Sequence, residues 1–221
     1  MPEALPQLNC RPLPAFDADK LDAVQTAFAR AEGCVLRQAW LAEPEPDFTT
    51  AVVRAGWRGN SLLIFAELED ADIFTRASAH NQRMWELGDV LEIFLSPENS
   101  ARYVEFHVTP NNLRLQLRLP DTTTLRGAQA ENRFDHLLLP EGVFHSRAWR
   151  QPENNKWFVF AEIPSVAVCG VDRPLAGTKW RFSFSRYDYI HGRAEPMISS
   201  TSPHARPDFH RREEWGTLIF V

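Results

Sequence analysis

Short apolar segments separated by turn residues dominate the chain. Segments of four to ten residues that are rich in Val, Ile, Leu and aromatic side chains, and are bounded by Gly, Pro, Asn and Asp, predict β-strands. Because they follow one another with few helical segments between them, they favour an all-β fold over a parallel α/β sheet. We expect an antiparallel β-sandwich, jelly-roll-like with immunoglobulin-like layers. The predicted strands are 34–41, 48–57, 61–69, 89–95, 102–108, 113–119, 143–149, 156–164, 179–187 and 216–221.

One or two short helices accompany these strands. Residues 16–33 place Leu21, Val24 and Phe28 at helical spacing, and a second short helix is predicted within 72–86. The stretch "PDTTTLRGAQAENR", beginning at Pro120, reads as a long polar loop inside a single domain that spans residues 1–221.

The segment "WELGDVLEIFL" (85–95) carries one carboxylate in an otherwise apolar strand. Side chains alternate along a strand, so Leu91 and Ile93 point to the core, while Glu92 shares the opposite face with Val90 and Phe94. An ionised glutamate without a partner is costly to bury. Glu92 is therefore predicted to have either a partner or a function.

The next two strands extend this polar face. The register that the loops suggest puts Glu92 beside Glu105, and then places His107 opposite Arg114 and Glu105 opposite Gln116. Two facing carboxylates require a cation, a shared proton or solvent. The alternative is an ordinary solvated sheet face, on which such charge ladders are common.

The composition is that of a soluble globular protein with a sizeable core. Of 221 residues, 44% are hydrophobic and 24% are charged, and the formal charge of −5 argues against a nucleic-acid partner. Three widely spaced cysteines form neither a disulfide framework nor a zinc pattern. The N-terminus lacks a signal peptide and no apolar stretch would span a membrane, so a cytoplasmic location is expected unless a leader was removed.

Several segments together resemble a known family. "WELGDVLEIFLSP" followed by "YVEFHVTPNN" resembles the central signature of family 9 carbohydrate-binding modules and the related DOMON-like domains. The later segments "WFVFAEIP", "WRFSFSRYD" and "FHRREEWGTLIFV" are similar to later strands of that family, in the same order. The resemblance covers roughly residues 40–221 and implies a jelly-roll-like antiparallel β-sandwich.

The resemblance also implies a binding site. In the sugar-binding members, two aromatic rings clamp a terminal sugar while a glutamate binds its hydroxyl groups. Trp85 matches the first ring, Glu92 the glutamate, and Phe209 the second ring, where the family has tryptophan. His107 stands where the sugar binders have arginine.

The chemistry of these residue types suits a saccharide. The C–H face of a sugar ring stacks on an aromatic ring, and its hydroxyl groups bind carboxylates and other charged groups. We therefore expect a non-catalytic domain that binds a carbohydrate end or similar polyol. The alternative is a structural or interaction domain in which the two rings are core residues. The predicted binding residues are Trp85, Glu92, Glu105, His107, Arg114, Gln116 and Phe209.

Enzymatic activity is not expected. The chain has no Gly-x-Ser-x-Gly motif, and Asp89 and Glu92 point to opposite faces of their strand. Glu92 with Glu105 would imitate the carboxylate pair of a retaining glycosidase, about 5 Å apart, but the resembling family does not catalyse a reaction.

No metal site is predicted. His204 and His210, with Asp208 between them, lie in a polar loop without a zinc spacing. Calcium is an open alternative at Glu69 and the two aspartates that follow, although no full ligand set is apparent. Haem is a more remote alternative, through Met84 and His107, and the oligomeric state is left open.

Overall fold

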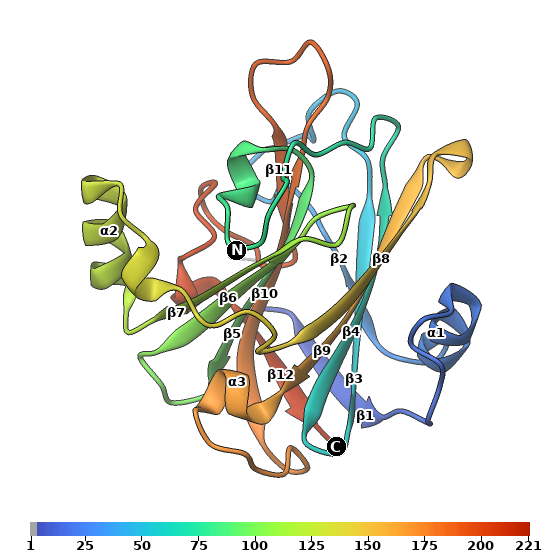
Figure 1. Ribbon diagram of the computed structural model, residues 1–221, viewed down its shortest axis with the longest axis vertical. Helices are drawn as coiled ribbons and strands as arrows, with labels where there is room; N and C mark the ends of the chain where they lie inside the picture. Colours follow the sequence, from blue (N-terminus) through green and yellow to red (C-terminus); the bar gives the residue numbers. More distant parts are fainter. Residues whose placement is uncertain (1–3) are drawn as a thin grey trace.

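The structure is a computed structural model that describes residues 4–221. In this part of the chain, twelve strands form one strongly curled sheet in which ten follow the order β7-β6-β5-β10-β12-β1-β3-β4-β9-β8, while β11 pairs with β10 and β2 with β3 (Figure 1). The strands are β1 Gln7–Pro12, β2 Gly33–Val35, β3 Ala51–Arg58, β4 Ser61–Glu69, β5 Val90–Pro97, β6 Tyr103–Val108, β7 Arg114–Leu119, β8 His145–Gln151, β9 Lys156–Pro164, β10 Lys179–Asp188, β11 Met197–Ser200 and β12 Gly216–Phe220.

The first strand makes the sheet mixed. β1 pairs in parallel with β12, where Gln7 faces Thr217, and again in parallel with β3, where Arg11 faces Gly56. The other pairs of neighbouring strands are antiparallel in the described residues. The prediction of a mostly β chain with few short helices is confirmed, but the prediction of a strictly antiparallel sheet is wrong, because β1 was not recognised as a strand.

The main core lies between the two halves of the curled sheet. It combines apolar side chains of β3, β4 and β9 from one half with those of β5, β6 and β10 from the other. The fully buried Trp157 on β9 and Trp180 on β10 are among its largest members. The alternation seen in the sequence at Leu91 and Ile93 therefore does point into the core, since both are completely buried there.

Each half carries a second apolar layer on its other face. On β4 and β9, helix α1 (Leu21–Phe28) packs Val24 and Phe28 against Phe65 and Phe160. This helix is shorter than the predicted 16–33. On β5, β6 and β7, the second layer is covered by the 3₁₀ helix η1 (Met84–Glu86), the helix α2 (Thr122–Glu131) and the segment before β12.

Helix α2 corrects the predicted polar loop. The Asp121 side chain accepts a hydrogen bond from the backbone N–H of Thr124 at 2.7 Å, and Asn132 ends the helix in a left-handed conformation. Leu125 and Ala128 bury its inner side, so α2 packs beside β7 at the edge of the sheet, while its outer side is exposed (Figure 1). Two apolar residues on the buried side of a ten-residue segment are too weak a pattern to predict this helix from the sequence.

The remaining short elements are the helix α3 (Ser165–Cys169) and the 3₁₀ helices η2 (Asp135–Leu137), η3 (Pro152–Asn154) and η4 (Arg212–Glu214). The helix predicted within 72–86 is reduced to η1 at the end of that segment. In the described residues, none of the helices has the length and apolar character needed to cross a membrane.

Candidate functional site

The strand pair β5–β6 brings Glu92 opposite His107, and Phe94 opposite Glu105. The sequence predicted Glu92 beside Glu105, so the observed register is shifted by two residues. A shift by two keeps every side chain on its predicted face. Glu92, Glu105 and His107 therefore do lie together, but an imidazole rather than a second carboxylate faces Glu92.

The strand pair β6–β7 differs from the prediction by one residue. Val108 pairs with Arg114, and the hairpin closes with a hydrogen bond from the Thr109 N–H to the Leu113 carbonyl. A shift by one residue exchanges the two faces of a strand. Arg114 and Gln116 thus point away from the predicted site, and their placement there was wrong.

Both displaced side chains have other surroundings. The Arg114 guanidinium lies over the Phe144 ring at 5.8 Å, and the Gln116 amide donates to Asn81 Oδ1 at 3.3 Å. The three leucines of β7 take their place on the site face, where they join the second apolar layer: Leu115, Leu117 and Leu119.

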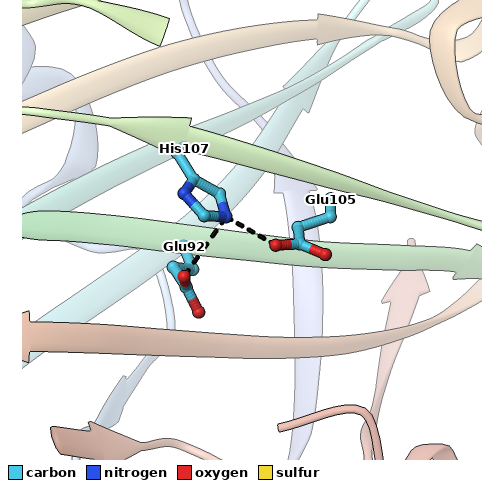
Figure 2. Close-up of side chains that lie close together, drawn as sticks. All are labelled: Glu92, Glu105 and His107. Carbon is cyan, nitrogen blue, oxygen red and sulfur yellow. Dashed lines mark hydrogen bonds and ion pairs between the residues drawn. The ribbon is translucent and has the colours of Figure 1, made fainter. Parts of the chain in front are cut away.

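The polar centre of the site is a buried triad of Glu92, Glu105 and His107 (Figure 2). Nε2 of His107 lies 2.7 Å from Glu105 Oε1 and 3.2 Å from Glu92 Oε1. Their exposed fractions are only 3% for Glu92, 4% for Glu105 and 0% for His107. The glutamate noticed in the sequence is therefore buried with a partner, which lies on the neighbouring strand.

Burial and mutual charge shift the protonation of the triad. Burial raises the pKa of Glu92 to about 8, although His107 opposes this effect. Burial alone would raise the pKa of Glu105, but its hydrogen bond with His107 and the nearby histidines hold it below the usual value. Burial alone would lower the pKa of His107, and the two glutamates raise it instead.

The triad lies beside an open pocket of about 650 Å³, which Glu92 and Glu105 line. The same pocket is lined by Trp85 and Phe209, the two rings predicted for the site. Residues 125–134, from α2 and the turn after it, contribute further lining residues, as does the segment 206–210. The structure thus brings five of the seven predicted residues together, since His107 touches both glutamates.

Trp85 presents a partly exposed ring. It meets His107 edge to face at 5.6 Å between ring centres, and Phe134 at 5.7 Å. Its backbone is held by the Tyr189 hydroxyl, which donates to the Trp85 carbonyl at 2.5 Å. This geometry fixes the indole on the wall of the pocket.

Phe209 is more enclosed than a free clamp ring. It is 5% exposed, and its ring lies 5.9–6.4 Å from those of Trp40, Phe94 and Tyr187. It contributes to the pocket wall while packing in the second apolar layer. Its position is therefore compatible with both the predicted ligand-facing role and the alternative core role, and the ligand-facing role stays a prediction.

Sequence reasoning missed several lining residues. Phe134 follows α2, and Arg126 on that helix forms an ion pair with Asp208 at 2.6 Å, which ties the two walls together. His210 also lines the pocket, and the Tyr103 hydroxyl lies 3.0 Å from its Nδ1. No strand alternation marked these residues, although His210 and Asp208 were noticed in their polar loop.

The suggested calcium ligands do not converge. Asp70 pairs with Arg186 at 3.3 Å, whereas Asp72 pairs with His191 at 2.7 Å and Glu69 approaches Lys156 at 4.0 Å. The haem alternative receives no support from Met84, which is completely buried in the apolar layer.

A second buried cluster lies elsewhere on the sheet. Asp70, Asp89 and Asp188 bring carboxylate oxygens within 4.8 Å of one another. The guanidinium of Arg186, 1% exposed, lies 3.0 Å from Asp188 and 3.3 Å from Asp70. This cluster therefore contains its own cation.

Comparison with known proteins supports the fold. No family model and no curated protein matches the chain. Among solved structures, a Bacteroides uniformis ATCC 8492 protein with a proposed carbohydrate-binding role is 20% identical, with a TM-score of 0.75 over 97% of this chain and 99% of that one.

Two structures of a family 9 carbohydrate-binding module from Caldicellulosiruptor kristjanssonii are also similar. The complex with cellotriose is 16% identical, with a TM-score of 0.64 over 97% of this chain and 93% of the module. The complex with glucose is 16% identical, with a TM-score of 0.65 over 99% and 96%. The chain thus shares the β-sandwich fold of these modules, whereas the resemblance to DOMON-like domains stays a prediction.

Proposed function

We propose that this protein is a non-catalytic domain that binds the end of a carbohydrate, or a similar polyol, in the pocket beside Trp85. One observation carries the proposal: two aromatic side chains, Trp85 and Phe209, line the same open cavity as the buried carboxylates of Glu92 and Glu105. The fold shared with modules solved in complex with glucose and cellotriose supports it.

The roles follow from the chemistry of the groups. The partly exposed Trp85 indole offers a flat apolar surface to the C–H face of a sugar ring. Glu92 and Glu105 offer oxygens to its hydroxyl groups, and His107 holds both carboxylates in place. Phe209 and Phe134 complete the aromatic wall.

The arrangement favours binding over catalysis. Both carboxylates converge on one nitrogen of His107 rather than standing apart on either side of the cavity. The solved modules with this fold are binding modules. We therefore assign the triad to recognition.

Calorimetric titration with glucose and with cellotriose tests the proposal. We expect saturable binding, weakened by about tenfold or more in Trp85→Ala, because the stacking surface is lost. Trp149→Ala, at a partly buried tryptophan that packs beside α1, is the matched control and should bind normally. If a panel of saccharides gives no heat, the domain has a structural or interaction role instead.

A further inference from the structure

The triad of Glu92, Glu105 and His107 has the geometry of a set of metal ligands. Its three donor atoms lie within 4.8 Å of one another, and two of the separations are 2.7 and 3.2 Å (Figure 2). Tetrahedral zinc, with bonds of about 2.0–2.2 Å, places neighbouring donor atoms about 3.3–3.6 Å apart. Movements of under about 1 Å for each donor atom would therefore bring all three to one ion.

The triad lacks a permanently charged cation such as the one in the other buried cluster. Arg186 lies among the carboxylates of that cluster, at Asp70 and Asp188. In the described part of the chain, the ion pairs of Glu92 and Glu105 involve histidines only. In the metal-free protein, protons on Glu92 and His107 neutralise the triad, since the pKa of each is raised. With both carboxylates ionised and the imidazole neutral, as metal binding requires, the triad carries a charge of −2, which is costly without a cation. A divalent ion would neutralise this charge.

One donor atom beside the pocket has no partner. Oε2 of Glu105 is buried and accepts no hydrogen bond among residues 4–221. It faces Nε2 of His210, which is 3.9 Å away and too far to donate. The other ring nitrogen of His210 is positioned by the Tyr103 hydroxyl at 3.0 Å. Metal-binding histidines are commonly oriented by such a bond on their far nitrogen.

We propose that the floor of the pocket is a binding site for a divalent transition metal ion of the zinc class. Nε2 of His107 and one oxygen each from Glu92 and Glu105 are the ligands, and His210 is the adjacent fourth donor. Mixed nitrogen and oxygen donors suit zinc and its neighbours better than calcium or magnesium, which prefer oxygen alone. The pocket leaves a coordination position for water or a ligand hydroxyl group.

Binding of the ion replaces the hydrogen bond inside the triad. His107 must bind through the lone pair of Nε2, so its imidazolium form releases the Nε2 proton to solvent and keeps the proton on Nδ1, while Glu92 releases its carboxyl proton. The inference does not depend on saccharide binding, because the ion and its ligands are complete without a sugar. A saccharide that fails to bind would leave it intact.

Titration of chelator-treated protein with Co²⁺ tests the site, because cobalt replaces zinc in nitrogen and oxygen sites and absorbs visible light. We expect one equivalent to bind with visible absorption bands, and Zn²⁺ to displace it. Glu105→Gln and His107→Ala should weaken binding at least tenfold. Glu213→Gln and His145→Ala, at exposed positions, are matched controls and should not weaken it.

Tyr103→Phe supplies a second test that keeps the buried ring in place. It removes only the hydroxyl that orients His210, and should weaken Co²⁺ binding by about tenfold, as supporting contacts do. Absence of bound cobalt at millimolar concentration would overturn the proposal. So would equal affinity in all variants, which places the ion elsewhere, or binding of Ca²⁺ in preference to Zn²⁺.

Discussion

Glu92 on β5 and His107 on β6 face each other directly, with 3.2 Å between the carboxylate Oε1 and the imidazole Nε2. This contact explains how a glutamate remains in an otherwise apolar strand. Glu105 holds the same nitrogen from the other side at 2.7 Å. The imidazole is thus shared by two carboxylates that line a pocket. We place both the proposed saccharide binding and the proposed metal binding in this pocket.

The register of β7 predicts that substitutions at two adjacent residues will have a large and a small effect on stability. Leu117 is 1% exposed and packs in the second apolar layer, so Leu117→Ala should lower the free energy of unfolding by about 2–5 kcal/mol. The Oε1 atom of Gln116 is buried and accepts no hydrogen bond in residues 4–221. Gln116→Leu should therefore change the free energy of unfolding by less than about 1.5 kcal/mol.

Urea unfolding and saccharide titration of both variants measure these effects. Gln116→Leu should bind saccharide like the unmodified protein, since its side chain points away from the pocket. A loss of binding in Gln116→Leu, with little change in Leu117→Ala, would favour the face assignment that the sequence suggested.

Arg186 is predicted to be essential for stability. Its guanidinium compensates Asp70 and Asp188, and all three are nearly inaccessible to solvent. Arg186→Met should cost about 3–5 kcal/mol, because it leaves buried carboxylates unpaired. Arg147→Met removes an exposed pair with Asp19 and should cost no more than about 1 kcal/mol. Equal effects of the two substitutions in urea unfolding would contradict this assignment.

The free energy of unfolding should fall as the pH rises, because of the buried cluster of Asp70, Asp89 and Asp188. Burial, together with the charge of Asp70, raises the pKa of Asp89 to about 8, although two backbone N–H groups oppose the effect. The folded state therefore keeps a proton that the unfolded chain loses above its ordinary value of 3.8. The resulting stabilisation is complete below about pH 4 and is lost as the pH rises towards about 8.

Urea unfolding between pH 5 and 8.5 checks this direction. Asp188, whose pKa burial raises to about 6 against the opposing charge of Arg186, contributes with the same sign. Asp89→Asn removes one titrating group and should give a shallower decline. An identical pH slope in the two proteins would exclude Asp89 as a source of the dependence.

The sequence predicted the positions of most strands. The predicted ranges 61–69 and 156–164 coincide with β4 and β9, because turn residues bound each of these apolar segments. The missed elements had weaker patterns. β1 contains Asn9, Arg11 and Pro12 in six residues, and α2 buries only Leu125 and Ala128.

The prediction of the candidate site succeeded where it depended on a single strand. It failed where it depended on how strands pair. Glu92 was singled out because its neighbours in the chain are apolar. Arg114 and Gln116 were placed wrongly because the turn after Thr109 sets the register one residue away from the assumed one. Phe134 and Arg126 were missed because their contacts are made across the pocket, with Trp85 and Asp208 respectively.

By itself, the sequence determined most of the strand segments, the inward face of β5 and the presence of one acidic side chain that needed a partner. These features depend on neighbours along the chain, and alternation along a strand records them directly. The tertiary structure decided that His107 is the partner of Glu92, that β1 runs parallel to its neighbours, and that α2 and the segment 206–210 enclose the pocket. These relations join residues far apart in the chain, and a pattern with a period of two residues does not specify which strands meet or in which register.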